Sequence, residues 1–146
     1  MQPNLNQIDL VVRDMEATLA FYRALGVEIP ESAIWRTATG MHHIDLTMPG
    51  GLIVHFDSPE LARVYDRGWK EPSGTGTRVV LSFKVASREE VDRLHGELVK
   101  LGHPSAQLPY DAFWGARYAI VEDPDGNHVG IMSPSDPSRR SAPPEI

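Results

Sequence analysis

The sequence contains no cysteine, which excludes disulfides, catalytic thiolates and zinc sites built on cysteine. It also lacks any apolar run that approaches the roughly 20 residues of a membrane-spanning helix, so no membrane partner is expected. Residues 1–6 show no basic segment leading into an apolar run, so no secretory signal is predicted. Without such signals, the cytoplasm is the expected compartment.

Positive charge is scarce: 14 Lys and Arg stand against 20 Asp and Glu, a net charge of −6. Apart from Arg139 and Arg140, the basic residues are scattered singly, whereas nucleic-acid-binding proteins usually present a basic face. No nucleic-acid partner is therefore expected. What is present is an ordinary globular composition, with 146 residues, 41% of them hydrophobic. A chain of this length buries roughly 70% of its unfolded surface, enough for a core without cross-links.

The first half of the chain predicts one strand, one helix and three further strands. Asp14 is a suitable helix N-cap, and Gly26 a suitable stop in the left-handed conformation. Between them the apolar residues recur at helical spacing: Met15, Leu19, Tyr22 and Leu25. The predicted strands are 7–12, 34–38, 42–48 and 52–57.

The second half repeats this order. Ser87 is the expected N-cap, Glu90 completes a capping box, and Gly102 ends the helix. Its apolar stripe consists of Val91, Leu94, Leu98 and Leu101. The predicted strands are 78–85, 105–108, 117–122 and 128–133.

The predicted fold class is therefore α+β, with two tandem βαβββ modules in one domain that spans residues 1–134. The modules cover about 5–58 and 77–134, the linker covers 59–76 with a short helix at 60–65, and 135–146 form a flexible tail.

Two motifs carry a resemblance to a known family. The first is 14–18 running into Phe21-Tyr22 and Leu25-Gly26, and the second runs from 114–117 through 123–127. The two motifs occur in this order on the repeated βαβββ plan. Together they make the chain similar to members of the vicinal oxygen chelate superfamily, and the resemblance covers about residues 7–134. That superfamily includes glyoxalase I, bleomycin-resistance proteins and extradiol dioxygenases. The resemblance implies a curled mixed sheet around a cup-shaped cavity, and a homodimer.

Alternation along each strand predicts which side chains face this cup, because the apolar set should pack on the helices. The cup-facing residues are predicted to be Gln7, Asp9, Val11, His43, Asp45, Thr47, Ile53, His55, Asp57, Arg78, Val80, Ser82, His128, Gly130 and Met132.

The resemblance implies that a metal in such a cup would be held at Gln7, His55, Arg78 and Gly130. Gln7 and His55 offer an amide oxygen and an imidazole, which suit a divalent metal. A guanidinium stays protonated and offers no lone pair, and glycine has no side chain. We therefore expect no cofactor; the alternative is a divalent metal such as zinc, nickel, manganese or iron, held by Gln7 and His55.

The ligand-binding residues are predicted among the polar and aromatic cup residues: Gln7, Asp9, Trp35, His43, Asp45, His55, Arg78 and Trp114. A loop at 109–115 carries Tyr110, Phe113 and Trp114, which either rim a pocket or plug the end of the sheet. His43 and His55 are the candidate catalytic residues, because a neighbouring carboxylate raises the basicity of an imidazole.

Three functions stay open, and with them the question whether the chain is an enzyme. The leading one is a metal-independent small-molecule-binding protein, similar to the bleomycin-resistance proteins of antibiotic resistance. The second is a metal-dependent lyase, isomerase or dioxygenase that uses Gln7 and His55. The third is a metal-free enzyme with His55 or His43 as its base.

Overall fold

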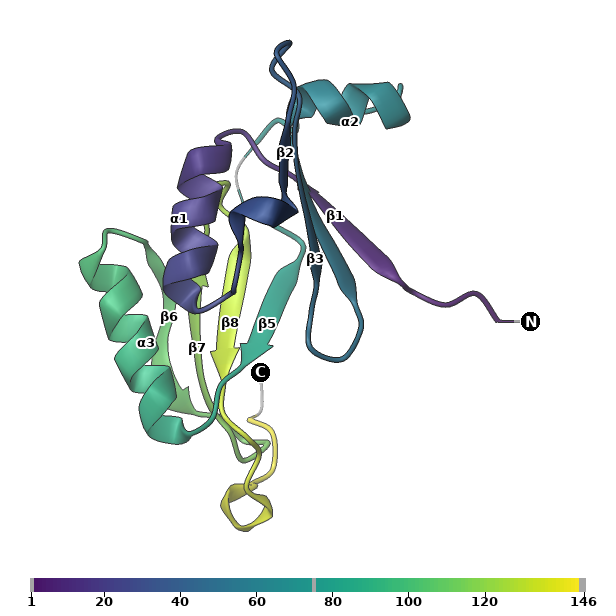
Figure 1. Cartoon of the computed structure of the whole chain (residues 1–146). Helices are drawn as coiled ribbons and strands as arrows, with labels where there is room; N and C mark the ends of the chain where they lie inside the picture. The colour runs from purple at the N-terminus through teal and green to yellow at the C-terminus, as the bar shows by residue number, and fades with distance from the viewer. Residues whose placement is uncertain (1, 75, 145–146) are drawn as a thin grey trace. The chain divides into compact units, whose positions relative to one another are not determined.

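The computed structural model describes residues 2–74 and 76–144, and it divides the chain into two compact units, Met1–Gly74 and Thr75–Ile146. Each unit holds a four-stranded mixed sheet and a long helix, drawn in purple to teal for the first and teal to yellow for the second (Figure 1). The predicted α+β class and the two tandem modules are confirmed. Within the described residues, no helix is long and apolar enough to cross a membrane.

In the first unit the sheet has the order β1-β4-β3-β2, in which β1 and β4 are parallel and the other pairs antiparallel. A helix, α1, follows β1, and a shorter helix, α2, follows β4. The elements are β1 (Gln7–Val11), α1 (Met15–Leu25), the 3-10 helix η1 (Glu31–Ala33), β2 (Ile34–Arg36), β3 (His42–Thr47), β4 (Ile53–Asp57) and α2 (Pro59–Tyr65).

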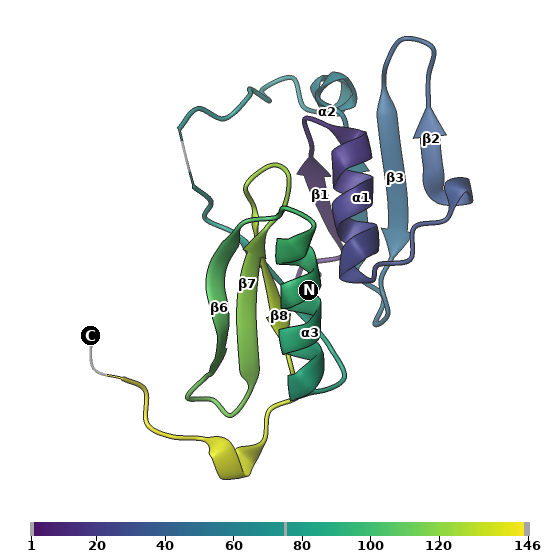
Figure 2. The ribbon, with the colours of Figure 1, turned by 90° about the vertical axis from the view of Figure 1, so that its left-hand side faces the viewer.

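The second unit repeats this topology with the order β5-β8-β7-β6, again with its first pair parallel. Helix α3 lies along one face of this sheet (Figure 2). The elements are β5 (Val80–Lys84), α3 (Arg88–Lys100), β6 (Ser105–Asp111), β7 (Arg117–Glu122), β8 (His128–Met132) and the 3-10 helix η2 (Pro137–Arg139).

The predicted N-caps of both long helices and the Gly26 stop are confirmed, whereas α3 ends at Lys100 with Leu101 as its C-cap. The Asp14 carboxylate accepts from the N–H of Ala17 at 3.0 Å, and Gly26 closes α1 in the left-handed region at φ 110°. The Ser87 hydroxyl accepts from the N–H of Glu90 at 3.1 Å at the start of α3. The Glu90 carboxylate itself contacts the Arg93 guanidinium, an ion pair on the helix surface.

The apolar faces of the strands pack as the alternation predicts. In the first unit Ile44, Leu46 and Phe56 are buried, and the Tyr22 ring of α1 lies 4.8 Å from the Phe56 ring. In the second unit the buried stripe of α3 packs with the buried residues of β7 and β8: Val91, Leu94, Leu98, Val121, Val129 and Ile131. Leu101, predicted in this stripe, is instead exposed because it lies beyond the end of α3. The opposite face of each sheet is left for the polar set.

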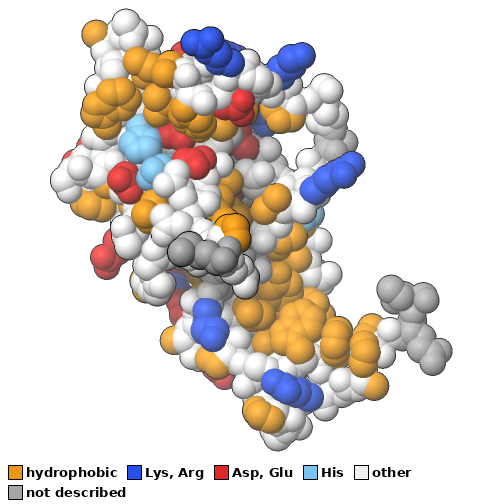
Figure 3. Space-filling view, turned by 90° about the vertical axis from the view of Figure 1, so that its right-hand side faces the viewer, with side chains coloured by type: hydrophobic (Ala, Val, Ile, Leu, Met, Phe, Trp, Pro, Cys, Tyr) orange, Lys and Arg blue, Asp and Glu red, His pale blue; other side chains and the backbone are white. Residues whose placement is uncertain are grey.

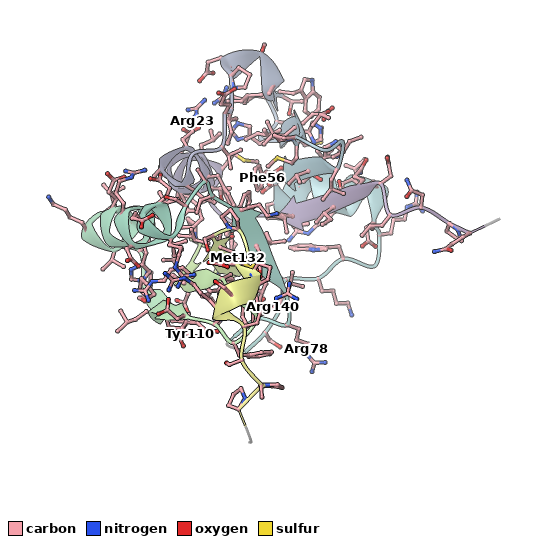
Figure 4. The ribbon with its side chains drawn as sticks, turned by 90° about the horizontal axis from the view of Figure 1, so that it is seen from below. Arg23, Phe56, Arg78, Tyr110, Met132 and Arg140 are labelled. Carbon is pink, nitrogen blue, oxygen red and sulfur yellow. The ribbon has the colours of Figure 1, made fainter. Side chains whose placement is uncertain are left out.

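Several predicted strand boundaries are wrong, and those at Arg78 and Tyr110 concern candidate site residues. Arg78 was expected in a strand, but β5 begins at Val80, and the Arg78 side chain extends outward, exposed to solvent (Figure 4). The pairing partner β8 also begins at His128, opposite Val80, so the ladder offers Arg78 no partner there. Tyr110 was expected in a loop, but β6 continues to Asp111 and pairs Tyr110 with Tyr118.

Residues 135–141 contact the turn between β6 and β7. The N–H of Asp136 donates to the carbonyl of Gly115 at 3.0 Å, and that of Ser141 to the carbonyl of Phe113 at 2.8 Å. The backbone approaches so closely that a Cβ at Gly115 would lie 2.3 Å from the carbonyl oxygen of Asp136. Glycine is therefore required here. We refer to residues 135–141 as the C-terminal strap.

Candidate functional site

The strand register of the first unit brings the predicted polar residues into two adjacent rows. One row pairs Asp9 of β1 with His55 of β4, and His55 in turn with Asp45 of β3. The next row pairs Asp57 of β4 with His43 of β3. Because directly paired residues place their side chains on the same face, both rows lie on the polar face of this sheet.

His55 lies between two carboxylates. Its Nδ1 is 2.9 Å from Asp9 Oδ1, and its Nε2 is 3.3 Å from Asp45 Oδ1. The Gln7 amide donates to both oxygens of Asp9, at 3.0 and 2.9 Å. Gln7 thus orients Asp9, and Asp9 fixes the His55 ring. Each ring nitrogen of His55 therefore has a carboxylate oxygen within 3.3 Å.

His43 is held in a similar way by a buried carboxylate. Its Nδ1 lies 2.5 Å from Asp57 Oδ1, and the Asp57 side chain is only 1% exposed. The other Asp57 oxygen accepts from the Tyr65 hydroxyl at 2.8 Å. Burial, followed by the contact with Asp57, raises the pKa of Tyr65 above its ordinary value of 10.0, so this hydroxyl stays a neutral donor.

Helix α2 places Tyr65 beside this pair. Ser58 caps the helix immediately after β4, with its hydroxyl accepting from the N–H of Leu61 at 3.4 Å, and Pro59 occupies the first turn. The Ser58 hydroxyl also accepts from the N–H of His42 at 3.0 Å, which ties the start of α2 to β3. The two imidazoles meet edge to face, with ring centroids 4.6 Å apart.

These groups surround a pocket of about 200 Å³. Its lining residues are Gln7, Asp9, His43, His55, Asp57, Leu61 and Tyr65. Among the residues the structure describes, no Lys or Arg lines it. Figure 3 shows histidine side chains among acidic ones on the surface, with hydrophobic side chains beside them. We call this cavity the first-unit pocket.

The structure sorts the predicted ligand-binding residues into two groups. Gln7, Asp9, His43 and His55 line the first-unit pocket, and Asp45 contacts His55 from its edge. Trp35, 48% exposed, pairs with His43 from β2 and lies on the same face without lining the pocket. Arg78 and Trp114 belong to the second unit.

In the second unit, the polar face is filled differently. The pair Asp9–His55 corresponds to Ser82–Gly130, and the pair Gln7–Ile53 to Val80–His128. The position equivalent to Gln7 is therefore Val80, and the assignment of Arg78 to it is wrong by two residues. Neither Val80 nor Gly130 carries a side chain that can ligate a metal.

Tyr118 occupies the space above Gly130. A Cβ at Gly130 would lie 2.4 Å from the Tyr118 hydroxyl oxygen and 2.7 Å from Ser82 Oγ, and these two hydroxyls are 3.1 Å apart. Tyr118 also belongs to a chain of edge-to-face rings. That chain comprises Tyr110, Tyr118, Trp114 and Phe113, with neighbouring centroids 6.3, 5.6 and 5.2 Å apart.

Sequence reasoning missed three pocket residues. Asp57 was placed on the polar face but given no role, and Leu61 and Tyr65 fall in the segment read as a linker. The signal that points to them is the cap at Ser58-Pro59, which starts a helix directly after β4 and so returns its side chains to the sheet.

Comparison with known proteins identifies the family. The family model "Glyoxalase/Bleomycin resistance protein/Dioxygenase superfamily" matches residues 4–131. No curated protein matched the chain. Among solved structures, a glyoxalase/bleomycin resistance protein/dioxygenase family enzyme from Burkholderia phytofirmans PsJN is 25% identical, with TM-score 0.72, covering 90% of this chain and 98% of that one.

Two further solved structures share the fold. A glyoxalase-related enzyme from Fulvimarina pelagi is 23% identical, with TM-score 0.72 and coverage of 91% of this chain and 89% of that one. The fosfomycin resistance protein FosX from Listeria monocytogenes is 17% identical, with TM-score 0.67 and coverage of 97% and 100%. The family match over nearly the whole chain, on two βαβββ units, leads to one conclusion: this chain belongs to the glyoxalase/bleomycin resistance protein/dioxygenase superfamily.

Proposed function

We propose that this protein binds a small organic molecule in the first-unit pocket and does so without a metal at the four superfamily positions. The observation that carries the proposal is the composition of the pocket. Three carboxylates, Asp9, Asp45 and Asp57, surround two imidazoles, and none of the described Lys and Arg residues lines the cavity. This composition favours a ligand that presents a cationic nitrogen, such as an amine or a guanidinium.

One objection to a cationic ligand is the positive charge of Arg78, a residue of the second unit. Arg78 on the polar face would oppose a cationic ligand, but the Arg78 side chain is exposed ahead of β5 and is not among the lining residues. Leu61 and the Tyr65 ring add an apolar wall, which is the usual complement to a few oriented polar groups in a ligand site. Cavity size limits the ligand, or the part of it that enters, to a small group.

The test is a binding screen of small amines and guanidines against chelator-treated, tag-free protein, followed by titration calorimetry. Asp9→Asn and Asp57→Asn should each weaken binding of a hit by about 10- to 100-fold, because a charged hydrogen bond contributes about 1.5–3 kcal/mol. Glu60→Gln, in α2 but outside the pocket lining, is the matched control. Saturable binding that ignores the two aspartates would refute the proposal, as would a panel without hits.

A second function, a metal-free enzyme, is favoured by one specific observation. Both His43 and His55 direct Nδ1 at a carboxylate, the arrangement that sets the tautomer of a general base. Such a base would exchange an acidic C–H proton of a bound ligand with solvent. Deuterium incorporation into a hit from D₂O, followed by NMR and lost in His43→Gln or His55→Gln, would establish this function. Binding without exchange would leave the protein a binder.

A further inference from the structure

We propose that His43, His55 and Asp57 form a binding site for a divalent transition-metal ion such as Zn²⁺ within the first unit alone. One potential ligand atom from each residue lies within 4.8 Å of the others, and the three are side by side on β3 and β4. Two imidazoles and one carboxylate are ligands that ions of this class accept, and three protein ligands leave a position open for water or an organic ligand.

The surroundings of these residues support the site. Metal-binding side chains are usually held by a second set of hydrogen bonds. Here Asp9 holds the His55 ring at 2.9 Å, and the Tyr65 hydroxyl holds the second oxygen of Asp57 at 2.8 Å. The Asp57 side chain is almost fully buried, and a buried carboxylate requires a compensating positive charge or several donors.

The local charge also favours a cation. Asp9 and Asp45 add two carboxylates beside the three proposed ligands, and among the described residues no Lys or Arg lines the pocket. If both imidazoles are neutral, the formal charge of this group is negative by three, and Coulomb attraction would draw a doubly charged ion. Leu61 adds an apolar side chain to the lining.

This site differs from the four-position site that the resemblance implies. It shares only His55 with that set. Its other two residues are His43, on the neighbouring strand β3, and Asp57, at the end of β4. It needs nothing from the second unit, where Val80 and Gly130 supply no ligand. It also goes beyond the expectation of no cofactor, because the sequence alone does not show that these side chains meet. It does not depend on the organic ligand proposed above.

The experiment uses metal alone, so its outcome is independent of any organic ligand. Full-length, tag-free protein is treated with chelator, dialysed against buffered Zn²⁺ or Co²⁺, and analysed by inductively coupled plasma mass spectrometry and titration calorimetry. We expect one ion per chain. Bound Co²⁺ should give visible d–d absorption typical of low coordination number, a readout that needs no activity.

Variants then assign the ligands. His43→Ala, His55→Ala and Asp57→Asn should each weaken Zn²⁺ binding by at least about 100-fold, and Asp9→Asn, which affects His55 indirectly, by about 10-fold. His128→Ala, in the second unit, is the control for adventitious histidine binding. Circular dichroism of each chelated variant checks that loss of binding is not loss of the fold.

Three results would overturn the inference. The first is a chelated protein that binds neither ion. The second is binding that His128→Ala weakens as much as His43→Ala, which would mean adventitious binding. The third is binding lost in Gln7→Ala and His55→Ala but kept in His43→Ala and Asp57→Asn, which would indicate the superfamily positions instead. A failure of this kind leaves the organic-ligand proposal standing, because that screen uses chelated protein.

Discussion

At the scale of single residues, Gly130 and His55 occupy matching strand positions in the two units but have different surroundings. The ladders of the two units match these positions, yet His55 meets carboxylates while Gly130 lies beneath the Tyr118 hydroxyl. A side chain at position 130 would have to displace Tyr118 or Ser82. In the second unit, the position that matches His55 therefore has no side chain, and the Tyr118 hydroxyl occupies the space that a side chain there would need.

This arrangement predicts that Gly130→Ala destabilises the protein by about 1–3 kcal/mol, the usual cost of overpacking. Tyr118→Phe removes the nearest contacting atom, so the same Gly130→Ala change should cost less in that background. Urea denaturation of the four proteins in a double-mutant cycle measures the coupling. Additive effects would contradict the packing account.

His95 makes stability depend on pH. It is buried on α3 with Nε2 2.8 Å from Ser105 Oγ, and burial lowers its pKa from the ordinary value of 6.5. Below about pH 6.5 the His95 imidazole is therefore protonated to a greater extent in the unfolded chain than in the folded chain. For this reason the free energy of unfolding falls as the pH drops through this range. The pKa of His42 is lowered in the same direction, chiefly by burial and then by Arg36, and adds to the effect.

We therefore expect the free energy of unfolding to decrease between about pH 7.5 and about pH 5.5, with a smaller decrease in His95→Gln. The residual slope in that variant reports His42 and other groups. Chemical denaturation at several pH values, with His128→Gln as a control, checks the sign. If the free energy of unfolding changed equally with pH in the wild type and in His95→Gln, His95 would have the same pKa in the folded and unfolded chains, and the prediction would be wrong.

At the scale of elements, the first-unit pocket depends on α2 following β4 without a loop. The Ser58 cap and Pro59 turn the chain into a helix whose last residue, Tyr65, reaches Asp57. Tyr65→Phe should destabilise the protein by about 1–2 kcal/mol, because it removes one donor from a buried carboxylate. Thermal and urea unfolding test this, with Tyr110→Phe in β6 as the control. An unchanged midpoint would mean that water replaces the hydroxyl.

Much of the element layout follows from sequence, because helix caps and alternation are local properties. Asp14, Gly26 and Ser87 fix helix ends through contacts within a few residues. Alternation likewise placed His43 and His55 on one face. It does not say which residues of neighbouring strands lie opposite each other, since that register depends on turn geometry and long-range pairing. The convergence of His43, His55 and Asp57 was for that reason not predictable.

The Arg78 error has the same origin. A shift of two residues along a strand preserves the face on which a side chain lies, so alternation accepts Arg78 and Val80 equally. Only the pairing of Val80 with His128 decides between them. The consequence drawn from Arg78, that the second half lacks a metal ligand at this position, holds for Val80 as well, because neither side chain ligates a metal.

At the scale of the whole molecule, the homodimer stays a prediction. Large apolar side chains are exposed in both units, among them Leu5, Val64, Val80 and Leu108. Such surface is a common basis for self-association. Sedimentation equilibrium should give about twice the chain mass of 16.2 kDa at micromolar concentration. A species of the single-chain mass across the concentration range would contradict the dimer.

The C-terminal strap has a practical consequence for studying this protein. Because Asp136 and Ser141 donate main-chain hydrogen bonds to Gly115 and Phe113, the chain end supports the turn that carries Trp114. A truncation designed at the edge of the family match would remove that support and alter an intrinsic fluorophore of the second unit. Emission from Trp114 can thus serve as a gauge of proteolytic trimming, and expression boundaries are best drawn beyond Ser141.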